Sequence, residues 1–452
     1  MLYRLRRLGV GISLMVAALA LVHLLKPPQP PSSLVNLAVF GSDANARPMS
    51  SFRAATPAAP TPAPTQLVTH PVETSRPSTL PAYLELLDSY RAMHRRMLAE
   101  ELPPRFLLYR PNAQLGNRLR GIISAFVYCL LTDRALVVEF SSAPYEKIRL
   151  SDLFASPGFE WELSAGSEWV RGLEAEPLLR EGTFLPQPTL EALLCRGREA
   201  VVAPLALVDG NLYWSTFLEH NPHFADFFAR YFEAGRVGER VAQTLFEPHP
   251  AVEALRRRWR EQEGVEGKHL VALQVRNDND PRRHPQVSEA EWRAYVDCSV
   301  QHLPAGVPKS DAVWFVATDS VASREIAAER LQGLNFRFNT QSFLPGGSVE
   351  GLRQALADIL IAAEASQAYL SPWSSYGRMI ALLNRNGGDF FMVTDGVNPP
   401  KDVHRSFNST GTPHCFRLLS REECPWLDAH TWFSKEVKRA SCYRPSMQLP
   451  YC

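Results

Sequence analysis

Several motifs that mark well-known enzyme classes are missing from this sequence. A Walker A sequence, whose glycine-rich loop and lysine hold nucleotide phosphates, does not occur, so the common ATPase and GTPase class is not indicated. No two cysteines are spaced as Cys-x-x-Cys, the pattern typical of structural zinc sites. The segment Ser374-Ser-Tyr-Gly377 lacks the leading glycine of a nucleophile elbow, which weakens a serine hydrolase interpretation.

The chain also lacks an excess of either charge. Its 48 lysines and arginines are balanced by 47 aspartates and glutamates, which gives a formal net charge of +1. This balance gives no reason to expect a nucleic acid or a strongly anionic polymer as a partner, so any basic binding site must be local. The length of 452 residues suffices for about two to three domains.

Residues 8–25 form an apolar run, interrupted only by Ser13 and His23, that is near the lower limit for spanning a bilayer. Three arginines in residues 1–7 favour a cytosolic location for this tail. We therefore predict a cytosolic tail at 1–7 and a transmembrane signal anchor at 8–25 in a single-pass type II membrane protein. A cleaved signal peptide is the alternative, and it would also send the rest of the chain into the secretory lumen.

Residues 26–82 are rich in proline, serine, threonine and alanine, and such a segment cannot bury enough apolar surface to fold. We predict a disordered stem there, an N-terminal Rossmann-like domain at 83–247, a C-terminal nucleotide-binding domain at 248–398 and a cysteine-rich segment at 399–452. Anchor, stem and large luminal part are the usual layout of Golgi glycosyltransferases, although single-pass receptors and proteases share it. A Golgi membrane location with a luminal catalytic part follows as an expectation.

Four of the seven cysteines crowd the final stretch of the chain: Cys415, Cys424, Cys442 and Cys452. Because a luminal compartment permits disulfides, we expect these four to pair, with three pairings open. Zinc ligation is the competing interpretation. The chain has one Asn-x-Ser/Thr sequon, at Asn408, which predicts a glycosylated surface loop near this tail.

Three apolar segments of strand length each end in polar residues. The run at 271–275 ends in Arg276, the run at 312–317 is followed by Asp319, and the run at 368–370 precedes Ser374 and Ser375. Ligands of open α/β sheets lie beyond the carboxyl ends of buried parallel strands, so this convergence predicts a nucleotide-binding domain. The guanidinium of Arg276 can hold two phosphate oxygens at once, although a structural ion pair at a strand end is the alternative.

A second αβ pattern precedes this region. A strand at 106–109, a helix at 119–131 and a strand at 135–140 are predicted to form a βαβ unit. Gly116 in the first loop lets the backbone approach a phosphate, and Asn117 and Arg118 are then expected to point at an anion. Polar loops at this place are common in αβ proteins, so the tripeptide alone is a weak signal.

The cluster after Arg276 raises the question of a metal ion. Asp278-Asn279-Asp280 fits the Asp-x-Asp pattern by which many glycosyltransferases hold a divalent metal against a nucleotide-sugar diphosphate. The arginine directly before it indicates instead that protein charge balances the diphosphate, so we expect no metal and no other cofactor. Asp278 is our candidate for the catalytic base, with Asp280 as the other possibility.

Four segments of the sequence resemble blocks of the plant-type xyloglucan fucosyltransferase family. They are Gly116 to Tyr128, Leu131 to Val137, Leu273 to Arg276 and Trp373 to Gly377, and weaker matches at 152–154 and 415–424 fall in the same order. The resemblance extends from about residue 105 to the C-terminus. It implies a GT-B-like fold of two Rossmann-like, doubly wound domains, GDP-fucose as donor, and inverting transfer of fucose to a glycan or polysaccharide acceptor. An α-1,2 linkage to galactose, a metal-independent reaction and a role in cell wall biogenesis are implied in the same way.

The resemblance also implies roles for individual residues. Arg276 would contact the donor diphosphate, Asn117 would reach the pyrophosphate from the other domain, and Asp319 would lie beside the nucleotide. The full candidate donor-binding set is Gly116, Asn117, Arg118, Gln274, Arg276, Asp319, Ser374, Ser375, Tyr376 and Gly377, with Arg276 and Asp278 as the catalytic candidates. Two other classes stay open, a metal-dependent transferase for another nucleotide sugar and a non-catalytic, lectin-like relative.

Overall fold

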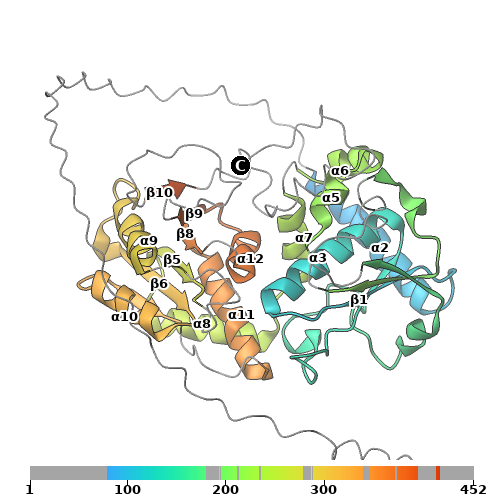
Figure 1. Cartoon of the computed structure of the whole chain (residues 1–452), viewed down its shortest axis with the longest axis horizontal. Helices are drawn as coiled ribbons and strands as arrows, with labels where there is room; N and C mark the ends of the chain where they lie inside the picture. Colours follow the sequence, from blue (N-terminus) through green and yellow to red (C-terminus); the bar gives the residue numbers. More distant parts are fainter. Residues whose placement is uncertain are drawn as a thin grey trace, which may run out of the picture. The chain divides into compact units, whose positions relative to one another are not determined.

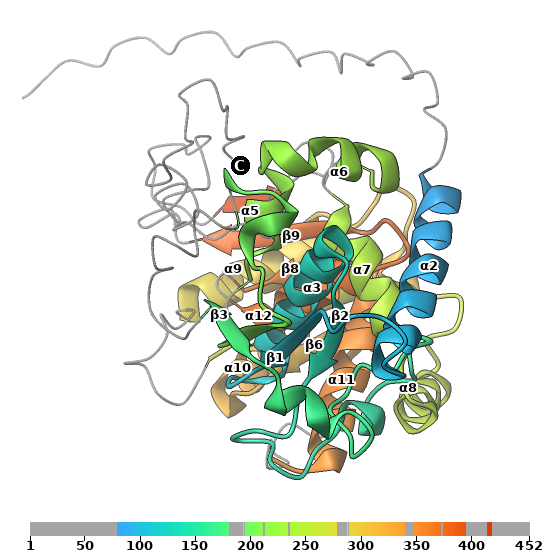
Figure 2. The same ribbon diagram turned by 90° about the vertical axis from the view of Figure 1, so that its right-hand side faces the viewer.

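Two mainly parallel sheets organise the chain in this computed structural model (Figures 1 and 2). The structure describes residues 79–179, 193, 195–210, 213–233, 236–277, 287, 289–339, 347–371, 374–394 and 414–417. By its backbone contacts this part is one unit that contains both sheets. The predicted α/β class with parallel sheets is therefore confirmed, whereas the predicted domain boundaries stay predictions.

The N-terminal sheet has the strand order β2-β1-β4-β3, and all its neighbouring strands are parallel. Its strands are β1 (Phe106–Arg110), β2 (Ala135–Val138), β3 (Ala175–Leu179) and β4 (Leu205–Asp209). Its helices are α2 (Leu80–Leu98), α3 (Leu115–Thr132), α5 (Ser215–Glu219), α6 (Ala225–Tyr231) and α7 (Val237–Leu245). Short 3-10 helices lie at Leu150–Asp152, Glu168–Gly172, Arg198–Ala200 and Pro222–Phe224.

The helix of the predicted βαβ unit begins earlier than the sequence indicated. It starts at Leu115 rather than at 119, so Gly116, Asn117 and Arg118 lie in its first turn and not in a loop. Gln114, the residue before the helix, has an extended backbone that ends the preceding loop. The first helical N–H groups of α3 therefore belong to the residues that the sequence assigned to a phosphate loop.

The C-terminal sheet has the order β10-β9-β8-β5-β6-β7, parallel except for β10, which runs antiparallel to β9. Its strands are β5 (His269–Val275), β6 (Ala312–Thr318), β7 (Phe336–Phe338), β8 (Gln367–Leu370), β9 (Asp389–Thr394) and β10 (His414–Arg417). Its helices are α8 (Pro250–Glu263), α9 (Glu289–Gln301), α10 (Val321–Arg330), α11 (Val349–Ala363) and α12 (Ser375–Leu383), and a 3-10 turn lies at Lys309–Asp311.

Strands β5 and β6 are buried almost throughout and mainly apolar, because helices cover both of their faces (Figure 1). Val271 and Leu273 belong to the same core cluster as Trp292 of α9, whereas Ala272 and Phe315 share a cluster with α8 and α11. Successive side chains of a strand point to opposite faces, so a strand buried on both sides needs a continuous apolar run. This is the reason for the pattern seen at 271–275 and 312–317.

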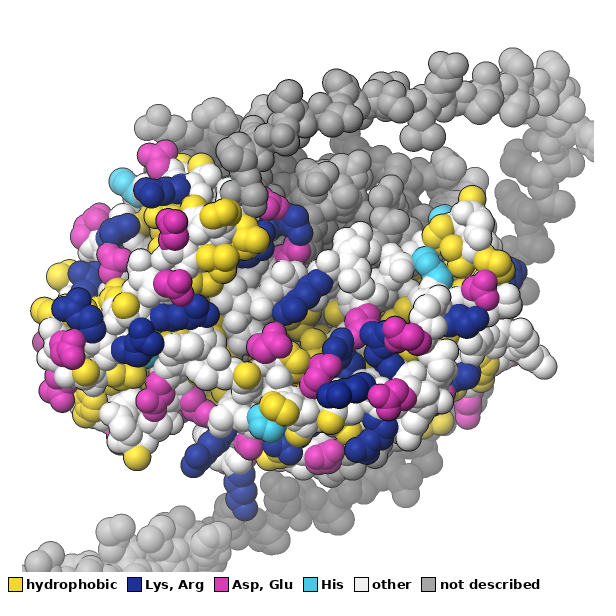
Figure 3. All heavy atoms as spheres, turned by 180° about the vertical axis from the view of Figure 1, so that it is seen from behind, with side chains coloured by type: hydrophobic (Ala, Val, Ile, Leu, Met, Phe, Trp, Pro, Cys, Tyr) yellow, Lys and Arg dark blue, Asp and Glu magenta, His cyan; other side chains and the backbone are white. Residues whose placement is uncertain are grey.

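Charged side chains are spread over the surface rather than gathered by sign. On the face shown in Figure 3, lysine and arginine side chains alternate with aspartate and glutamate side chains over the described part. Many of them form ion pairs, such as Arg293 with Glu329 and Arg330 with Asp297. This pattern fits the balanced composition.

The structure describes the side chains of three of the seven cysteines, and the predicted pairing of the last four stays a prediction. Cys195 and Cys298 are disulfide-bonded, which the sequence analysis did not propose, and Cys129 is buried and free. Cys424, Cys442 and Cys452 lie outside the described residues, as does the sequon at Asn408, and the side chain of Cys415 is not described. In the described part, no helix has both the length and the hydrophobicity to cross a bilayer, and residues 8–25 are not included in it.

Gly121 fixes the distance between α3 and the strand beneath it. A Cβ atom at this position would lie 1.8 Å from the hydroxyl oxygen of Tyr109. Tyr109 on β1 is fully buried, and its hydroxyl donates a hydrogen bond of 2.9 Å to the carbonyl of Gly210 after β4. One glycine thus allows α3, β1 and the end of β4 to be tied together.

We predict that Gly121→Ala lowers the free energy of unfolding by about 1–3 kcal/mol, because the added methyl group overpacks the helix against Tyr109. Gly172→Ala is the matched control, since no atom lies within 4 Å of a Cβ added there. Urea unfolding followed by circular dichroism measures both variants. Equal stability of the two variants would contradict this account of the α3 packing.

Candidate functional site

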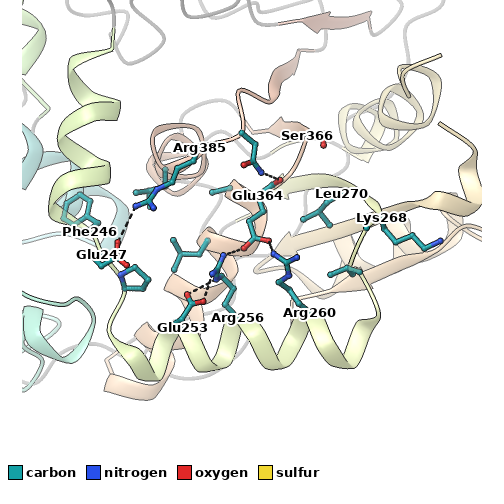
Figure 4. A pocket seen from close by; sticks show the side chains of 17 residues that line it. Phe246, Glu247, Glu253, Arg256, Arg260, Lys268, Leu270, Glu364, Ser366 and Arg385 are labelled. Carbon is teal, nitrogen blue, oxygen red and sulfur yellow. Dashed lines mark hydrogen bonds and ion pairs between the residues drawn. The ribbon is translucent and has the colours of Figure 1, made fainter. Parts of the chain in front are cut away.

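Two cavities in the described part are large enough for a small ligand. The larger, about 680 Å³, lies at the amino end of β5, where Gly267, Lys268 and Leu270 form part of its wall (Figure 4). All of its basic side chains pair with carboxylates: Arg256, Arg260, Lys268 and Arg385. Figure 4 shows Glu364 between Arg256 and Arg260, and the amino ends of strands are not where ligands of open α/β sheets bind.

The smaller cavity, about 390 Å³, lies at the carboxyl end of β5. Its wall is formed by Gln114, Leu115, Gly116, Tyr145, Gln274, Val275, Arg276, Ala317, Thr318, Asp319, Asn339, Gly351, Leu352, Ala355, Asp358, Ser375 and Tyr376. We call it the donor cavity, because residues of the predicted donor-binding set lie on its wall. Six residues of the predicted donor-binding set lie on this wall: Gly116, Gln274, Arg276, Asp319, Ser375 and Tyr376.

The topology of the C-terminal sheet explains the place of the donor cavity. From β5 the chain proceeds to β6 and β7 on one side, and it then returns to β8 on the other side of β5. The crevice between the carboxyl ends of such neighbouring strands is where open α/β sheets bind their ligands. Arg276 follows β5 directly, and its backbone N–H donates to the Ser371 hydroxyl after β8 at 3.1 Å.

Three helices begin at the donor cavity. Leu115 and Gly116 are the first residues of α3, Gly351 and Leu352 lie in the first turn of α11, and Ser375 begins α12. The positive dipole end of each helix favours a negatively charged ligand. The donor cavity is therefore suited to phosphate groups.

Gly116 allows two of these helix starts to meet. A Cβ atom there would lie 2.8 Å from the backbone carbon of Ser375 and 2.9 Å from the backbone nitrogen of Tyr376. These are backbone atoms, which cannot rotate away as a side chain can. Any residue other than glycine would therefore separate the first turns of α3 and α12.

Arg276 lies on the cavity wall and is held by Asp319. Its Nε atom is 3.0 Å from Oδ2 of Asp319, and the side chains are 40% and 34% exposed. Oδ1 of the same aspartate accepts a hydrogen bond of 2.9 Å from the backbone N–H of Asn277. Asp319 thus fixes both the guanidinium and the chain that follows it, and the partly exposed guanidinium can approach a ligand.

Gln274 joins the two strands that frame the cavity. Its Nε2 donates to Oγ of Ser374 at 3.1 Å, and its Oε1 accepts from the backbone N–H of Ser371 at 3.2 Å. Oγ of Ser374 also accepts from the N–H of Gly377 and caps α12. A Cβ atom at Gly377 would lie 2.6 Å from Oε1 of Gln274. Ser374 and Gly377 therefore act behind the wall, where they position Ser375 and Tyr376.

The structure places Arg118 differently from the prediction. Its side chain is fully buried, and its guanidinium donates to the carbonyls of Ala113, Phe140 and Ala143 at 2.5–2.6 Å. It also stacks against the rings of Phe140 and Tyr145, and burial lowers its pKa to about 10. Arg118 does not point into the donor cavity. It fixes the two loops that carry Gln114 and Tyr145, which do line it.

Asp358 is a cavity residue that the sequence analysis missed. It lies on α11, is 3% exposed, and its Oδ1 accepts a hydrogen bond of 3.1 Å from Gln354. Burial raises its pKa from 3.8 to about 7. The signal in the sequence was an aspartate within the apolar face of an amphipathic helix, where a charged side chain is costly unless it has a purpose or a partner.

Tyr376 also lies on the cavity wall, close enough to Asp358 and Asp319 to feel both charges. Its hydroxyl donates to the carbonyl of Ala355 at 3.0 Å, and burial, with the charges of Asp358 and Asp319, raises its pKa well above the usual value. The tyrosine is therefore neutral and cannot serve as a base near neutral pH. It contributes an uncharged part of the cavity wall.

Three groups of predicted residues remain to be placed. Asn117 is partly buried in the first turn of α3 and does not line the donor cavity. Asp278, Asn279 and Asp280 fall outside the described residues. In the part that is described, no group of three or more histidine, cysteine, aspartate or glutamate side chains is placed to hold a metal ion.

These features define a class of site. An arginine, three helix starts and a buried carboxyl lie on one cavity wall at the strand crevice of a parallel sheet, and the arginine and helix starts favour an anion. Such an arrangement is typical of α/β folds that bind nucleoside diphosphates. The comparisons with known proteins point to one family of this class.

The family model for xyloglucan fucosyltransferase matches residues 84–173. A curated relative, galactoside 2-alpha-L-fucosyltransferase of Arabidopsis thaliana, is 24% identical over an alignment of 363 residues that covers 69% of this chain and 61% of the relative. The chain thus matches about three fifths of that relative's length. The resemblance inferred from the sequence motifs is confirmed by these matches.

Solved structures are similar in fold. A point mutant of Arabidopsis thaliana FUT1 in complex with GDP has a TM-score of 0.56 and 18% identity, covering 75% of this chain and 83% of that one. The fucosyltransferase NodZ from Bradyrhizobium has a TM-score of 0.47 and 16% identity, covering 70% and 99%. The likeness to FUT1 shows that this chain shares the α/β fold with parallel sheets of that structure.

The raised pKa of Asp358 makes a prediction about stability. The folded protein binds this proton more tightly than the unfolded chain does, so the free energy of unfolding falls as pH rises from about 4 through about 7. We expect the parental protein to lose stability relative to Asp358→Asn across this window, by at most ~1.4 kcal/mol per pH unit. Urea unfolding at several pH values gives the difference.

Asp311→Asn is the matched control, because Asp311 is 54% exposed and is not part of the cavity wall. Its stability is expected to follow the parental curve at every pH. If the Asp358→Asn curve also runs parallel to the parental one, Asp358 does not titrate with a raised pKa.

Proposed function

We propose that the protein is an inverting glycosyltransferase that moves fucose from GDP-fucose to a hydroxyl of a glycan, in α-1,2 linkage to galactose. The observation that carries the proposal is the donor cavity, whose wall brings together Arg276, three helix starts and the buried Asp358. The similarity to fucosyltransferases in sequence and fold supports the choice of GDP-fucose. No cofactor is part of the proposal.

The groups on the cavity wall suit the two ends of GDP. The guanidinium of Arg276 can donate two parallel hydrogen bonds to phosphate oxygens, and helix starts add N–H donors. Guanine carries two adjacent N–H donors on its base-pairing edge, and an ionised Asp358 carboxylate can accept both. Adenine presents an acceptor at the same edge, so a carboxylate there favours guanine.

Charge neutralisation by protein groups is also the proposed source of catalysis. When the bond from fucose to the β-phosphate breaks, negative charge develops on the departing GDP. Arg276 is held in place by Asp319 before the reaction, so it needs little reorganisation to stabilise this charge. Proton removal from the acceptor is still assigned to Asp278 as a prediction from the sequence.

The location in the cell is proposed from the sequence alone. The apolar run at 8–25, the arginines before it and the proline-rich residues 26–82 support a type II anchor and a stem in the Golgi membrane. The donor cavity would then lie in the lumen, where the acceptor glycans and GDP-fucose meet. Glycosylation of Asn408 and disulfides within residues 399–452 belong to the same proposal.

The proposed function is tested by incubating residues 79–452 with GDP-fucose, GDP-mannose and UDP-galactose in turn, each with and without lactose, a β-galactoside. Lactose-dependent release of GDP from GDP-fucose alone is expected, with an α-1,2-fucosylated product identified by NMR. Release of UDP, or no nucleotide release with any donor, would overturn the proposal. Binding of lactose without turnover would favour a lectin-like relative.

Replacing the central arginine should impair turnover without unfolding the protein. We predict that Arg276→Lys lowers kcat by ~10²–10³, because lysine supplies the charge but not two parallel hydrogen bonds to the diphosphate. Arg293→Lys is the matched control, since Arg293 pairs with Glu329 at the surface. A kcat within about threefold of the parental value in Arg276→Lys would show that this arginine is only structural.

Chelation should leave the reaction intact. We predict that activity in excess EDTA stays within about twofold of the untreated value, because Arg276 and the helix starts can balance the charge of GDP. The measurement is GDP release before and after dialysis against EDTA. Loss of activity that manganese restores would favour the metal-dependent alternative through Asp278-Asn279-Asp280.

A further inference from the structure

The N-terminal sheet has a ligand crevice of its own. From β1 the chain proceeds through α3 to β2 on one side, whereas β4 is the neighbour of β1 on the other side. The crevice at the carboxyl ends of β1 and β4 is therefore the place where this sheet is expected to bind a ligand. Arg110 ends β1 and Asp209 ends β4, directly opposite each other in the parallel register.

These two side chains form a bidentate ion pair. Nε of Arg110 lies 2.5 Å from Oδ1 of Asp209, and Nη2 lies 2.7 Å from Oδ2. The side chains are 41% and 30% exposed, so a ligand can reach them. Hydrogen bonding to Asp209 raises the pKa of Arg110, which stays charged. The pair is therefore a preformed group with adjacent donors and acceptors and with no net charge.

The donor cavity contains the same construction. Arg276 follows β5, and its partner Asp319 follows β6, the neighbouring parallel strand. In both sheets an arginine after the first strand thus pairs with an aspartate at the end of an adjacent strand. One pair lies where the nucleotide is proposed to bind, and the other has no assigned ligand.

The backbone around Arg110 and Asp209 is rigid. The Tyr109 hydroxyl donates to the carbonyl of Gly210, and the N–H of Gly210 donates to the carbonyl of Arg110 at 3.1 Å. Gly210 has a φ of 131°, in the region where side chains are rarely tolerated, and this lets the chain turn directly after Asp209. A rigid backbone under two exposed polar side chains is typical of binding sites rather than of stabilising surface pairs, which contribute little.

The pair is close to the donor cavity along the chain. Arg110 is followed after four residues by Gln114, which lines the cavity, so their Cα atoms are at most about 14 Å apart. An acceptor sugar held at Arg110 and Asp209 can therefore extend to a donor sugar at the cavity mouth.

We propose that Arg110 and Asp209 bind hydroxyl groups of the acceptor sugar, an inference that rests on the proposed transferase function. The carboxylate accepts hydrogen bonds from sugar hydroxyls, and the guanidinium donates to their oxygens. Because the two charges cancel, the pair favours a neutral sugar over an acidic one. Asp209 is engaged by the guanidinium through both oxygens, so its role is to hold the acceptor and not to remove its proton.

The test compares Asp209→Asn and Arg110→Lys with the parental protein, using lactose as acceptor and GDP-fucose as donor. Both variants are expected to raise the KM for lactose at least tenfold, and to leave the KM for GDP-fucose and the melting temperature nearly unchanged. Asp133→Asn is the matched control, because Asp133 forms an exposed ion pair with Arg198 at 2.9 Å, just before β2 rather than after a strand end. It should leave both KM values unchanged.

A KM for lactose within twofold of the parental value in both variants would overturn the inference. An equal rise in the KM for GDP-fucose, or a lower melting temperature without change in the KM for lactose, would show a structural pair and also overturn it. Failure of the proposed function appears separately, as absence of GDP release by the parental protein. Saturation-transfer NMR of lactose in the presence of GDP would then still show whether the pair binds a sugar, since the signal must be lost in both variants.

Discussion

The contact between Gly116 and the first turn of α12 is the constraint on which the site depends. It brings the start of α3 against the start of α12 at backbone distance, although the two helices follow strands of different sheets. The same approach lets α12 pack along α3 and α7, so that one apolar core continues from the N-terminal sheet to the C-terminal one. The positive ends of the helices then converge on one volume, and the arginine after β5 completes it.

Around this contact, buried polar groups hold the cavity wall in place. Gln274 links the end of β5 to the loop before α12. Arg118 links the loop before α3 to the loop after β2, and Asp319 holds Arg276. Buried polar groups rigidify a structure when all of them have partners. The cavity is thereby shaped before a ligand arrives, which is the condition for electrostatic stabilisation of a departing group.

The sequence was informative where burial imposes a pattern. Continuous apolar runs at 271–275 and 312–317 identified strands covered on both faces, and polar residues after them identified the edge where Arg276 and Asp319 lie. The role of Arg118 could not be predicted, because whether an arginine faces a ligand or the carbonyls of its own loops depends on tertiary packing. Asp358 was missed because a single acid in an apolar helix face gives no indication of the cavity opposite it. The disulfides of Cys195 and Cys298 depend on distances that spacing along the chain does not contain.

Helix α12 connects the donor cavity to the segment between α7 and α8. Its first turn forms part of the cavity wall. Just beyond its last turn, the carbonyl of Asn384 accepts a hydrogen bond from Gln243, and Arg385 pairs with Glu247. Gln243 and Glu247 lie shortly before α8 in the chain. A helix is stiff along its axis, so a push on one end displaces the other by a similar amount. If a bound phosphate shifts the first turn of α12, the far end of the helix moves with it. That movement then reaches the segment between α7 and α8, where the chain passes from the N-terminal sheet to the C-terminal sheet.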